Sequence, residues 1–405
     1  MSSQASDQLY STPQWWKEAV VYQVYPSSFQ AHAGSTTGCG SIKGIISRLD
    51  YLKALGVDVV WSSLSQFTLL VVPSPQVDMG YDISDYIQID ARYGTLDDVD
   101  TIIAEVRKWD MKLVLDLVVN HTSDQHPWFL ESRGGKNHPK RDCYIWRKGK
   151  VVTETGGTVD QEPPNNWAQI LGEAGSAWTP EQPDLNSDNP EAPEYDDAEI
   201  TLDPKHHTFQ PVFRDFVNGP KMHGYLQEMH REVLSRYDAI TVGEMPWISD
   251  ESEILRTVGA NAGELRMIFI FDLRVMIGNN GWNTVFIENH DNPRSVSRYV
   301  DDSDDSDDSD EYGHIGAKLL ALMQTTLGGT LFVYQGEEIG MRNIPKEWDV
   351  AKEYKDIETI NYWNKVNDVY AGSPELVQHG RAVVQMKARD HARTPMNWAL
   401  GIATA

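Results

Sequence analysis

Seven short runs rich in Val and Ile recur along this chain, and their recurrence limits the fold more than any other feature. They are residues 19–25, 57–61, 112–119, 239–244, 267–272, 284–291 and 330–338. Near-continuous apolar runs of this length are typical of parallel strands that are covered on both faces. Helical patterns lie between some of them, at residues 42–56, 96–110 and 221–237. In the last pattern we expect Met222, Tyr225 and Leu226 to belong to one apolar helix face.

Strands that alternate with helices predict either a doubly wound parallel sheet or a (β/α)8 barrel. Polar or ionisable residues end several of the runs: His121 follows the third, Glu244 ends the fourth and Asp291 ends the sixth. A charged residue at the end of a buried strand is costly unless it is paired or has a function. Three such endings favour a barrel with an active site at the carboxyl ends of its strands.

The charge and composition of the chain exclude several classes of partner. The formal net charge of -25 disfavours nucleic acid, because binding to phosphates depends on Lys and Arg. The 13 Trp and 17 Tyr residues suit a neutral sugar, whose apolar faces stack on flat rings, although most of these rings are expected in the core.

Cysteine usage and hydropathy indicate a compartment. Two cysteines, Cys39 and Cys143, give neither a disulfide framework nor a metal-binding CxxC spacing. No run of about 18 apolar residues occurs, and the first residues lack the pattern of a secretory signal. We therefore expect a cytoplasmic protein without a membrane segment; the sequence does not predict its oligomeric state.

Several short motifs, in the same order along the chain, resemble those of the α-glucosidases of the α-amylase family (glycoside hydrolase family 13), of the maltase and oligo-1,6-glucosidase type. They are QVYPSSF, DMGYDISDY, DLVVNHTSDQHPWF, PPNNW, QPDLN, TVGEMP, IENHDNPRSVSR, LFVYQGEEIGM and ARTPMNW. The resemblance implies a (β/α)8 barrel with an irregular insertion after its third strand. We expect the first part of the barrel at 1–121, the insertion at 122–185 and the rest of the barrel at 186–405.

The resemblance also implies a reaction, the retaining hydrolysis of terminal α-linked glucose from oligosaccharides of the maltose and isomaltose kind. In such enzymes one carboxylate attacks the sugar and a second carboxyl protonates the leaving oxygen. Glu244, in TVGEMP, would be the general acid and base, and Asp291, in IENHD, would stabilise the transition state. No cofactor is implied.

The same likeness assigns substrate-binding roles. Asp78 would accept hydrogen bonds from the terminal glucose and pair with Arg393, and Tyr81 would stack on the sugar ring. His121 and His290 would contact sugar hydroxyls. A further acid, Asp116, is expected in a buried ion pair that braces the barrel.

The nucleophile of the family is the main departure from the pattern. In the family's fourth strand it follows Gly-Phe-Arg and one variable residue, a pattern that does not occur between residues 186 and 218. Asp215 directly follows Arg214, so on a strand the two side chains would point to opposite faces. We therefore expect an incomplete barrel that lacks the region of strand 4, and a chain that ends before a C-terminal β-domain. Because the nucleophile segment is absent, we also expect this chain to be inactive as a hydrolase.

Other departures leave alternatives open. The segment 33–44 has no Asp or Glu where the family often has a metal-binding loop, so no metal is expected. The missing nucleophile raises the alternative of a catalytically silent glucoside-binding homologue. Transglycosylation or isomerisation of sucrose or trehalose would use the same residues, and the sequence does not distinguish α-1,4 from α-1,6 linkage.

Overall fold

The computed structural model describes residues 14–63, 73–146, 219–245, 250–259, 263–269, 282–300 and 309–398. It also describes the short stretches 150–153, 159–162, 167–168, 183, 185 and 210–211. The side chains of these short stretches from 150 to 168 and at 210–211 are not described.

All seven predicted runs form strands, and each strand occupies part of its run. They are β1 (Val20–Val24), β2 (Val59–Ser62), β3 (Lys112–Leu115), β8 (Val242–Glu244), β9 (Met267–Phe269), β10 (Thr284–Val285) and β11 (Thr330–Tyr334). The prediction of strands was therefore confirmed for these segments, but β3 and β8 contain no buried residue, so the predicted burial was wrong for these two strands.

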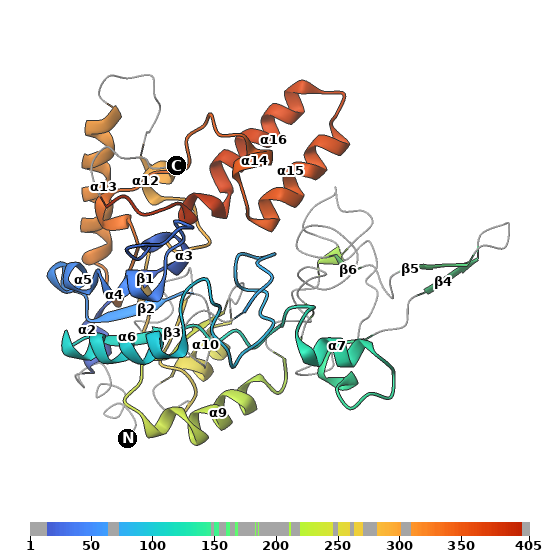
Figure 1. Ribbon diagram of the computed structural model, residues 1–405, viewed down its shortest axis with the longest axis horizontal. Helices are drawn as coiled ribbons and strands as arrows, with labels where there is room; N and C mark the ends of the chain where they lie inside the picture. Colours follow the sequence, from blue (N-terminus) through green and yellow to red (C-terminus); the bar gives the residue numbers. More distant parts are fainter. Residues whose placement is uncertain are drawn as a thin grey trace.

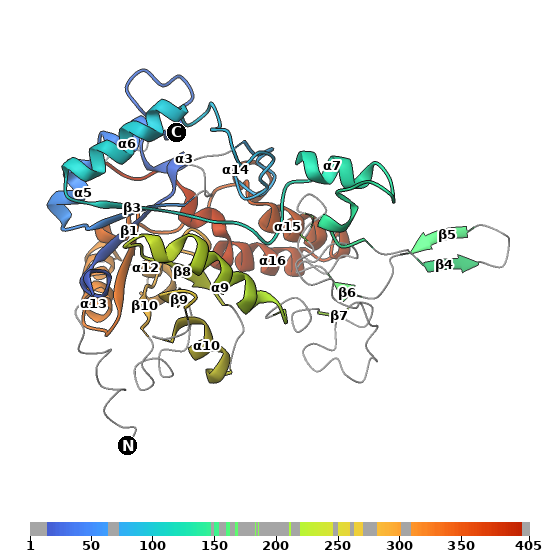
Figure 2. The same cartoon turned by 90° about the horizontal axis from the view of Figure 1, so that it is seen from below.

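The strands form two parallel sheets, and β9 and β10, which belong to different sheets, lie close together (Figure 2). One has the order β10-β11-β1-β2-β3 and the other pairs β8 with β9. The Thr284 hydroxyl of β10 donates to the carbonyl of Ile268 in β9 at 3.2 Å, which joins the sheets. Within the described residues β3 and β8 each pair on one side only, so the barrel is not closed there. Residues 186–209, where the fourth strand was expected, lie outside the described part of the chain.

Helices cover the strands and link them (Figures 1 and 2). Around the first strands lie α2 (Trp15–Glu18), α3 (Pro26–Phe29), α4 (Ile42–Ile46), α5 (Leu49–Leu55) and α6 (Leu96–Lys108). Later helices are α7 (Pro127–Arg133), α9 (Met222–Glu232), α10 (Glu251–Val258), α12 (Ser295–Tyr299), α13 (Ser309–Thr325), α14 (Val350–Glu353), α15 (Ile357–Val369) and α16 (Pro374–Lys387). Short 3-10 turns are η1 (Arg141–Cys143), η3 (Leu234–Arg236), η4 (Glu337–Ile339) and η5 (Arg389–Arg393). None of the helices in the described part of the chain has the length and apolarity to cross a bilayer.

Parts of the expected insertion are also described. The strands β4 (Lys150–Thr153) and β5 (Val159–Glu162) form an antiparallel hairpin, which lies far from β1 in both views (Figures 1 and 2). β6 (Trp167–Ala168) pairs in parallel with β7 (Gln210–Pro211). Most of residues 147–218 lie outside the described part of the chain.

Local sequence signals set the ends of the crossover helices. At the start of α6 the Thr95 side chain accepts from the Asp98 amide while the Asp98 carboxylate accepts from the Thr95 amide. This capping box satisfies backbone donors that the first helical turn leaves free. α5 ends at Gly56, whose φ of 94° is readily adopted by glycine.

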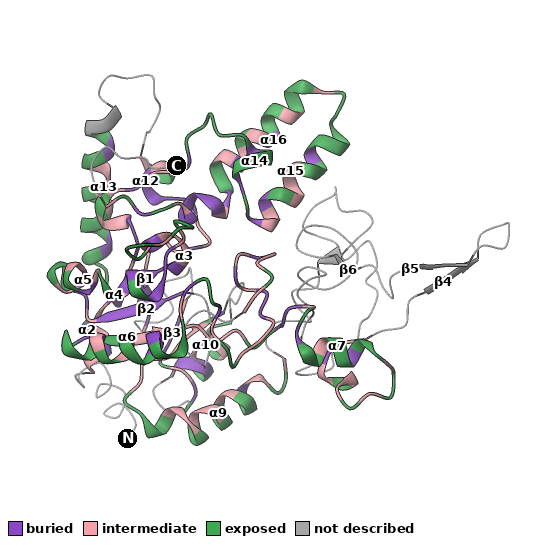
Figure 3. Ribbon diagram, viewed as in Figure 1, coloured by how far each residue is buried: buried purple, intermediate pink, exposed green. Residues whose placement is uncertain are grey.

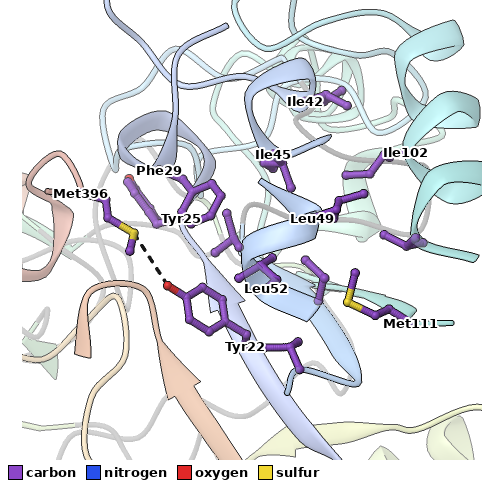
Figure 4. Packing of buried hydrophobic residues seen from close by; sticks show 14 of the residues in the cluster. Tyr22, Tyr25, Phe29, Ile42, Ile45, Leu49, Leu52, Ile102, Met111 and Met396 are labelled. Carbon is purple, nitrogen blue, oxygen red and sulfur yellow. Dashed lines mark hydrogen bonds between the residues drawn. The ribbon is translucent and has the colours of Figure 1, made fainter. Parts of the chain in front are cut away.

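Two clusters of buried side chains lie on opposite faces of β1. Tyr22 and Val24 belong to one cluster with Ile42 of α4, Leu52 of α5 and Ile102 of α6. Figure 4 shows Tyr22 at the side of this cluster that faces Met396. The Tyr22 hydroxyl also reaches the Met396 sulfur at 3.7 Å, so the end of the described chain closes this cluster (Figure 4). Figure 3 shows the buried residues gathered on β1 and β2.

The second cluster fills the space that the curled strands enclose. Val21 on β1 points the opposite way from Tyr22, as successive residues of a strand do. It joins Trp61 of β2, Phe332 of β11 and Met267 of β9. The Trp61 ring stacks on Phe269 of β9 with centroids 5.4 Å apart, so the strands curve toward one another across this core as in a barrel.

The predicted apolar face of α9 was only partly right. Met222 packs on Ile268 and its neighbours, but Tyr225 is 48% exposed. The one buried side chain of this helix is His223, whose ring nitrogens lie 2.9 Å from Glu264 and 2.8 Å from Glu253. A polar contact that apolar periodicity does not reveal therefore positions the helix.

Candidate active site

Glu244 is the last residue of β8, where the strand ends beside Phe269 of β9. Its side chain is exposed, yet burial is the largest cause that raises its pKa, to about 7. The negative charges of Asp291 and Asp116 raise the pKa further. The carboxyl is thus crowded by protein atoms while it remains open to solvent, and close enough to two acids to feel their charge.

Asp291 lies in a tight loop that follows β10. The Asp291 amide donates to the Asn289 side chain at 2.9 Å. At the start of the same loop, the buried Glu288 carboxylate accepts from the Ser295 amide at 2.6 Å and pairs with Arg294 at 3.1 Å. These contacts hold the loop closed on itself, which fixes the direction of the Asp291 side chain.

Three cationic or polar partners surround the Asp291 carboxylate. His290 Nε2 lies 3.2 Å away, Arg393 Nη2 2.7 Å and Arg389 Nη1 3.4 Å. Burial alone would favour the protonated form, but the combined field of His290, Arg389 and Arg393 outweighs it and holds the pKa of Asp291 below its usual value. Asp291 is therefore ionised at neutral pH while Glu244 is partly protonated.

Asp78 and Tyr81 are presented by a compact turn. The Asp82 carboxylate accepts from the amides of Val77 and Asp78 at 2.9 and 3.2 Å, and Gly80 adopts a φ of 114° that suits glycine. Asp78 is only 3% exposed, and Arg389 Nη2 contacts its carboxylate at 2.9 Å.

Tyr81 links the turn to the strand ends. Its ring stacks on His290, with centroids 5.1 Å apart and an angle of 19° between the planes. Its hydroxyl donates to the Asp116 carboxylate at 3.1 Å, and the Trp61 indole N–H donates to the other oxygen of Asp116. Asp116 was expected to brace the barrel, but these contacts make it part of the site.

His121 is buried beside Tyr81, and protein groups engage both of its ring nitrogens. Nε2 lies 3.0 Å from the Tyr81 carbonyl and Nδ1 lies 2.9 Å from the Asn120 amide nitrogen. Burial lowers the pKa of His121. In this arrangement the imidazole supports Tyr81, whereas the sequence suggested a direct contact with sugar.

Arg393 does not form the ion pair that was expected for it. It contacts Asp291 at 2.7 Å and Asp356 at 2.9 Å, whereas the ion pair with Asp78 is formed by Arg389. Asp356 is fully buried, and Arg389 contacts it at 2.7 Å. The reason is spatial: both arginines lie on η5, and the start of α15 brings Asp356 between them.

Sequence reasoning therefore missed Arg389 and Asp356. The spacing of Arg389 and Arg393, four residues apart in RDHAR, is a signal that could have identified the first. Nothing in the sequence around Asp356 distinguishes it from an ordinary helix-capping Asp, a role that it also has in α15.

Two further expectations concern the nucleophile and metals. Asp215 lies outside the described residues. Within the described part of the chain, no group of three or more His, Cys, Asp or Glu side chains is placed to hold a metal ion.

The fold and the site together define a class of protein. Parallel strands that curl toward a barrel present, at their carboxyl ends, one carboxyl with a raised pKa and one with a lowered pKa, next to a buried Asp and an aromatic ring. Such a pair of oppositely tuned acids is typical of glycoside hydrolases.

The family follows from direct comparison. Residues 23–195 and 272–403 match the model of the α-amylase catalytic domain, and the chain belongs to this family. The segment 196–271, which contains Glu244, lies between the two matched stretches. Its similarity to curated α-glucosidases and oligo-1,6-glucosidases places the chain among the α-glucosidase-type enzymes of glycoside hydrolase family 13.

Curated relatives and solved structures agree on this class. The α-glucosidase of Schizosaccharomyces pombe is 38% identical over 460 positions, which cover 95% of this chain and 75% of the relative. The oligo-1,6-glucosidase of Parageobacillus thermoglucosidasius is 39% identical with the same coverage. Among structures, isomaltulose synthase from Erwinia rhapontici NX5 has a TM-score of 0.79 at 32% identity, covering 96% of this chain and 76% of that one. Trehalose-6-phosphate hydrolase from Bacillus licheniformis has a TM-score of 0.74 at 34% identity, with 95% and 75% covered.

Proposed function

We propose that this protein binds the terminal glucose of oligosaccharides of the maltose and isomaltose kind, as a retaining α-glucosidase, and that this chain hydrolyses them weakly. The observation that carries the proposal is the opposite tuning of two neighbouring carboxyls, Glu244 with a pKa of about 7 and Asp291 with a lowered pKa. Hydrolysis of a glycosidic bond needs one proton donor and one permanent anion at the same place.

The two acids would have different catalytic roles: Glu244 transfers protons and Asp291 stabilises positive charge. Glu244 gives its proton to the glycosidic oxygen as the bond to the anomeric carbon breaks and leaves an oxocarbenium-like sugar cation. Water then attacks this cation and gives its proton to Glu244. Asp291, held ionised by Arg393, Arg389 and His290, stabilises the positive charge that develops on the sugar ring.

The sugar-binding roles rest on the groups beside them. The Asp78 carboxylate is buried and oriented by Arg389, which suits it to accept hydrogen bonds from glucose hydroxyls. Tyr81 offers an aromatic ring next to the acids, and His290 packs against it. His121 would act through Tyr81, whose carbonyl it contacts.

Weak turnover is proposed because the attacking carboxylate of the family has no clear counterpart. The Arg-x-Asp pattern does not occur between residues 186 and 218. The alignment with the S. pombe enzyme runs over 460 positions, whereas 95% of this 405-residue chain is about 385 residues, so about 75 positions are filled by the relative alone. This supports a matched region that is shorter than in the relative, and we propose that part of the difference is the family's strand 4.

Two alternatives use the same residues. The similarity to isomaltulose synthase supports an isomerase, in which the released sugar is captured again before water attacks. A silent glucoside-binding homologue would keep Asp78, Tyr81 and Arg393 for recognition without turnover. For the place of action we propose the cytoplasm, because two cysteines give no disulfide framework.

Turnover and binding separate these proposals. Purified protein is incubated with a chromogenic α-glucoside, and maltose and isomaltose binding is followed by calorimetry. We expect binding with slow release of the chromophore, and loss of release in Glu244→Gln with binding retained. Binding without any release favours the silent homologue. If the protein neither binds the sugars nor releases the chromophore, the proposal is contradicted. Sucrose converted to a second disaccharide favours the isomerase.

The identity of the attacking group needs a second experiment. A fluorinated glucosyl fluoride that traps the covalent intermediate labels the nucleophile, and peptide mass mapping locates the label. Label on Asp215 would overturn our rejection of that residue. Label on Asp116, which contacts Tyr81 at 3.1 Å, would show that another acid replaces the family's nucleophile. We expect no stoichiometric label.

A further inference from the structure

His290 lies between two groups of opposite hydrogen-bonding character. The ring is 5% exposed and packs between Tyr81 and Tyr25, with centroids at 5.1 and 6.4 Å. Its backbone carbonyl accepts from Arg393 Nε at 3.0 Å. The ring is therefore fixed in place, and the location of its proton depends on what each nitrogen faces.

Nδ1 faces a side-chain amide. The Nε2 atom of Gln23 lies 2.9 Å from it and also donates to the Ser63 hydroxyl oxygen at 2.5 Å. Gln23 is 1% exposed and belongs to β1, between β2 and β11, so its backbone cannot move away. An amide NH2 group only donates, and His290 Nδ1 must therefore accept.

Nε2 faces a carboxylate. Asp291 Oδ2 lies 3.2 Å away and, being ionised, only accepts. The proton of a neutral imidazole must then be on Nε2. If the Gln23 amide were turned by 180°, its oxygen would accept from Nδ1–H, and the lone pair of Nε2 would point at the Asp291 anion. A doubly protonated ring would fit the turned amide, but the lowered pKa of His290 favours the neutral ring. For a neutral ring the two contacts agree on one orientation of the amide and one tautomer.

We propose that Gln23 is a positioning residue that fixes His290 as the neutral tautomer with its proton on Nε2. The relevance of this tautomer to sugar binding rests on the proposed function. The Nε2–H of His290 then donates to the Asp291 carboxylate and stabilises this anion, while Nδ1 accepts from Gln23. Because an NH2 group faces Nδ1, a second proton on the ring is disfavoured, which agrees with the pKa of His290 being lowered chiefly by burial.

The charged and titratable groups around the ring are consistent with this role. Asp291 and Asp116 favour a positively charged imidazole, whereas Arg393 and Arg389 oppose it. Since these charges act in opposite directions on the total protonation, the tautomer is selected by the contacts of Nδ1 with Gln23 and of Nε2 with Asp291.

The test is to change what faces Nδ1 and to observe the ring directly. Protein labelled with ¹⁵N-histidine is studied by long-range ¹H–¹⁵N NMR, and the signals of His290 are identified by their loss in His290→Gln. In the unchanged protein we expect Nδ1 to have the shift of an unprotonated nitrogen and Nε2 that of a protonated one. In Gln23→Glu a carboxylate faces Nδ1, so we expect protonation of Nδ1 and a higher titration midpoint for His290.

Two further variants provide controls. Gln23→Met removes the donor without adding an acceptor, and we expect a smaller rise of the midpoint. Ser63→Ala removes the other partner of the amide and should leave the tautomer unchanged.

The outcomes distinguish this inference from the proposed function. A protonated Nδ1 in the unchanged protein would overturn it, as would identical His290 signals and midpoints in Gln23→Glu and Gln23→Met. If the tautomer behaves as expected but the unchanged protein binds no glucoside, the proposed function fails while the assignment to Gln23 stands. Far-UV circular dichroism of each variant checks that it is folded.

Discussion

At the scale of single residues, the site works by giving neighbouring carboxyls different environments. Glu244 is crowded and faces other acids, whereas two guanidinium groups and an imidazole surround Asp291. A group whose pKa changes on folding makes stability depend on pH. The raised pKa of Glu244 therefore predicts a measurable effect on the pH dependence of folding stability, even if the chain hydrolyses nothing.

The first prediction concerns Glu244→Gln. Unfolded, this carboxyl has its ordinary pKa of about 4.5, and folded its pKa is about 7, so between these values the folded state binds more protons. Its contribution to stability is complete below the lower value and is lost as pH rises through the higher one. We expect the melting temperature of the unchanged protein to fall relative to Glu244→Gln between about pH 5 and pH 8. Parallel pH profiles of the two proteins would contradict the raised pKa.

The second prediction concerns Asp356, which is buried between Arg389 and Arg393. Asp356→Asn keeps a residue that can cap α15 but leaves two guanidinium groups with one fewer counterion. We expect a loss of about 3–5 kcal/mol in the free energy of unfolding, measured with denaturant. The matched control is Glu105→Gln, which removes a surface pair with Lys108 and should cost less than about 1 kcal/mol. Equal effects would mean that burial adds nothing to the Asp356 pairs.

At the scale of elements, α13 is an unusual helix because its small residues face inward. A side chain at Gly316 would meet Val300 at 2.3 Å, and one at Gly313 would meet Arg342. On the opposite side Ile315 and Leu319 are 54% and 64% exposed. The close packing of this helix thus depends on glycine rather than on large apolar side chains.

The third prediction compares two glycines in helices. Gly316→Ala gains helix propensity but inserts a methyl group against Val300, and we expect a net loss of about 1–3 kcal/mol. The control is Gly224→Ala in α9, where no atom lies within 4 Å of the added carbon. There we expect a gain of about 0.5–1 kcal/mol. Thermal unfolding of both variants measures the difference, and a stabilising Gly316→Ala would show that α13 packs more loosely.

The sequence was sufficient for the strands and insufficient for the pairings within the site. Each apolar run carries its own period and length, so β1 and β11 could be located one by one. The partner of Arg393 depends on where α15 and η5 approach each other, which no local pattern encodes. For the same reason the buried face of α9 centres on His223, whose partners Glu253 and Glu264 come from later segments.

At the scale of the whole molecule, the two described sheets differ in how well their strands are paired and buried, with β1 at one extreme and β8 at the other. β1 has neighbours on both sides and four of its five residues are buried, whereas β8 pairs only with β9 among the described residues and has none. Opening of the structure should therefore begin at β8 and reach β1 last.

The fourth prediction follows from this difference. In hydrogen exchange followed by mass spectrometry, peptides that contain residues 20–24 should exchange much more slowly than those that contain 242–244. Adding maltose should protect the second set more, since Glu244 lies there. Equal exchange in both segments would indicate that the sheet is uniformly stable, as in a closed barrel.

The two arginines of η5 also have a consequence for how the protein is made. Asp78 lies 311 residues before Arg389 in the chain, and Asp291 lies 102 residues before Arg393. While a ribosome is still synthesising the chain, the acids of the site have emerged but their counterions have not. Until η5 leaves the exit tunnel, the nascent protein must tolerate mutually repelling carboxylates, and a chaperone that delays compaction would help it most at that stage.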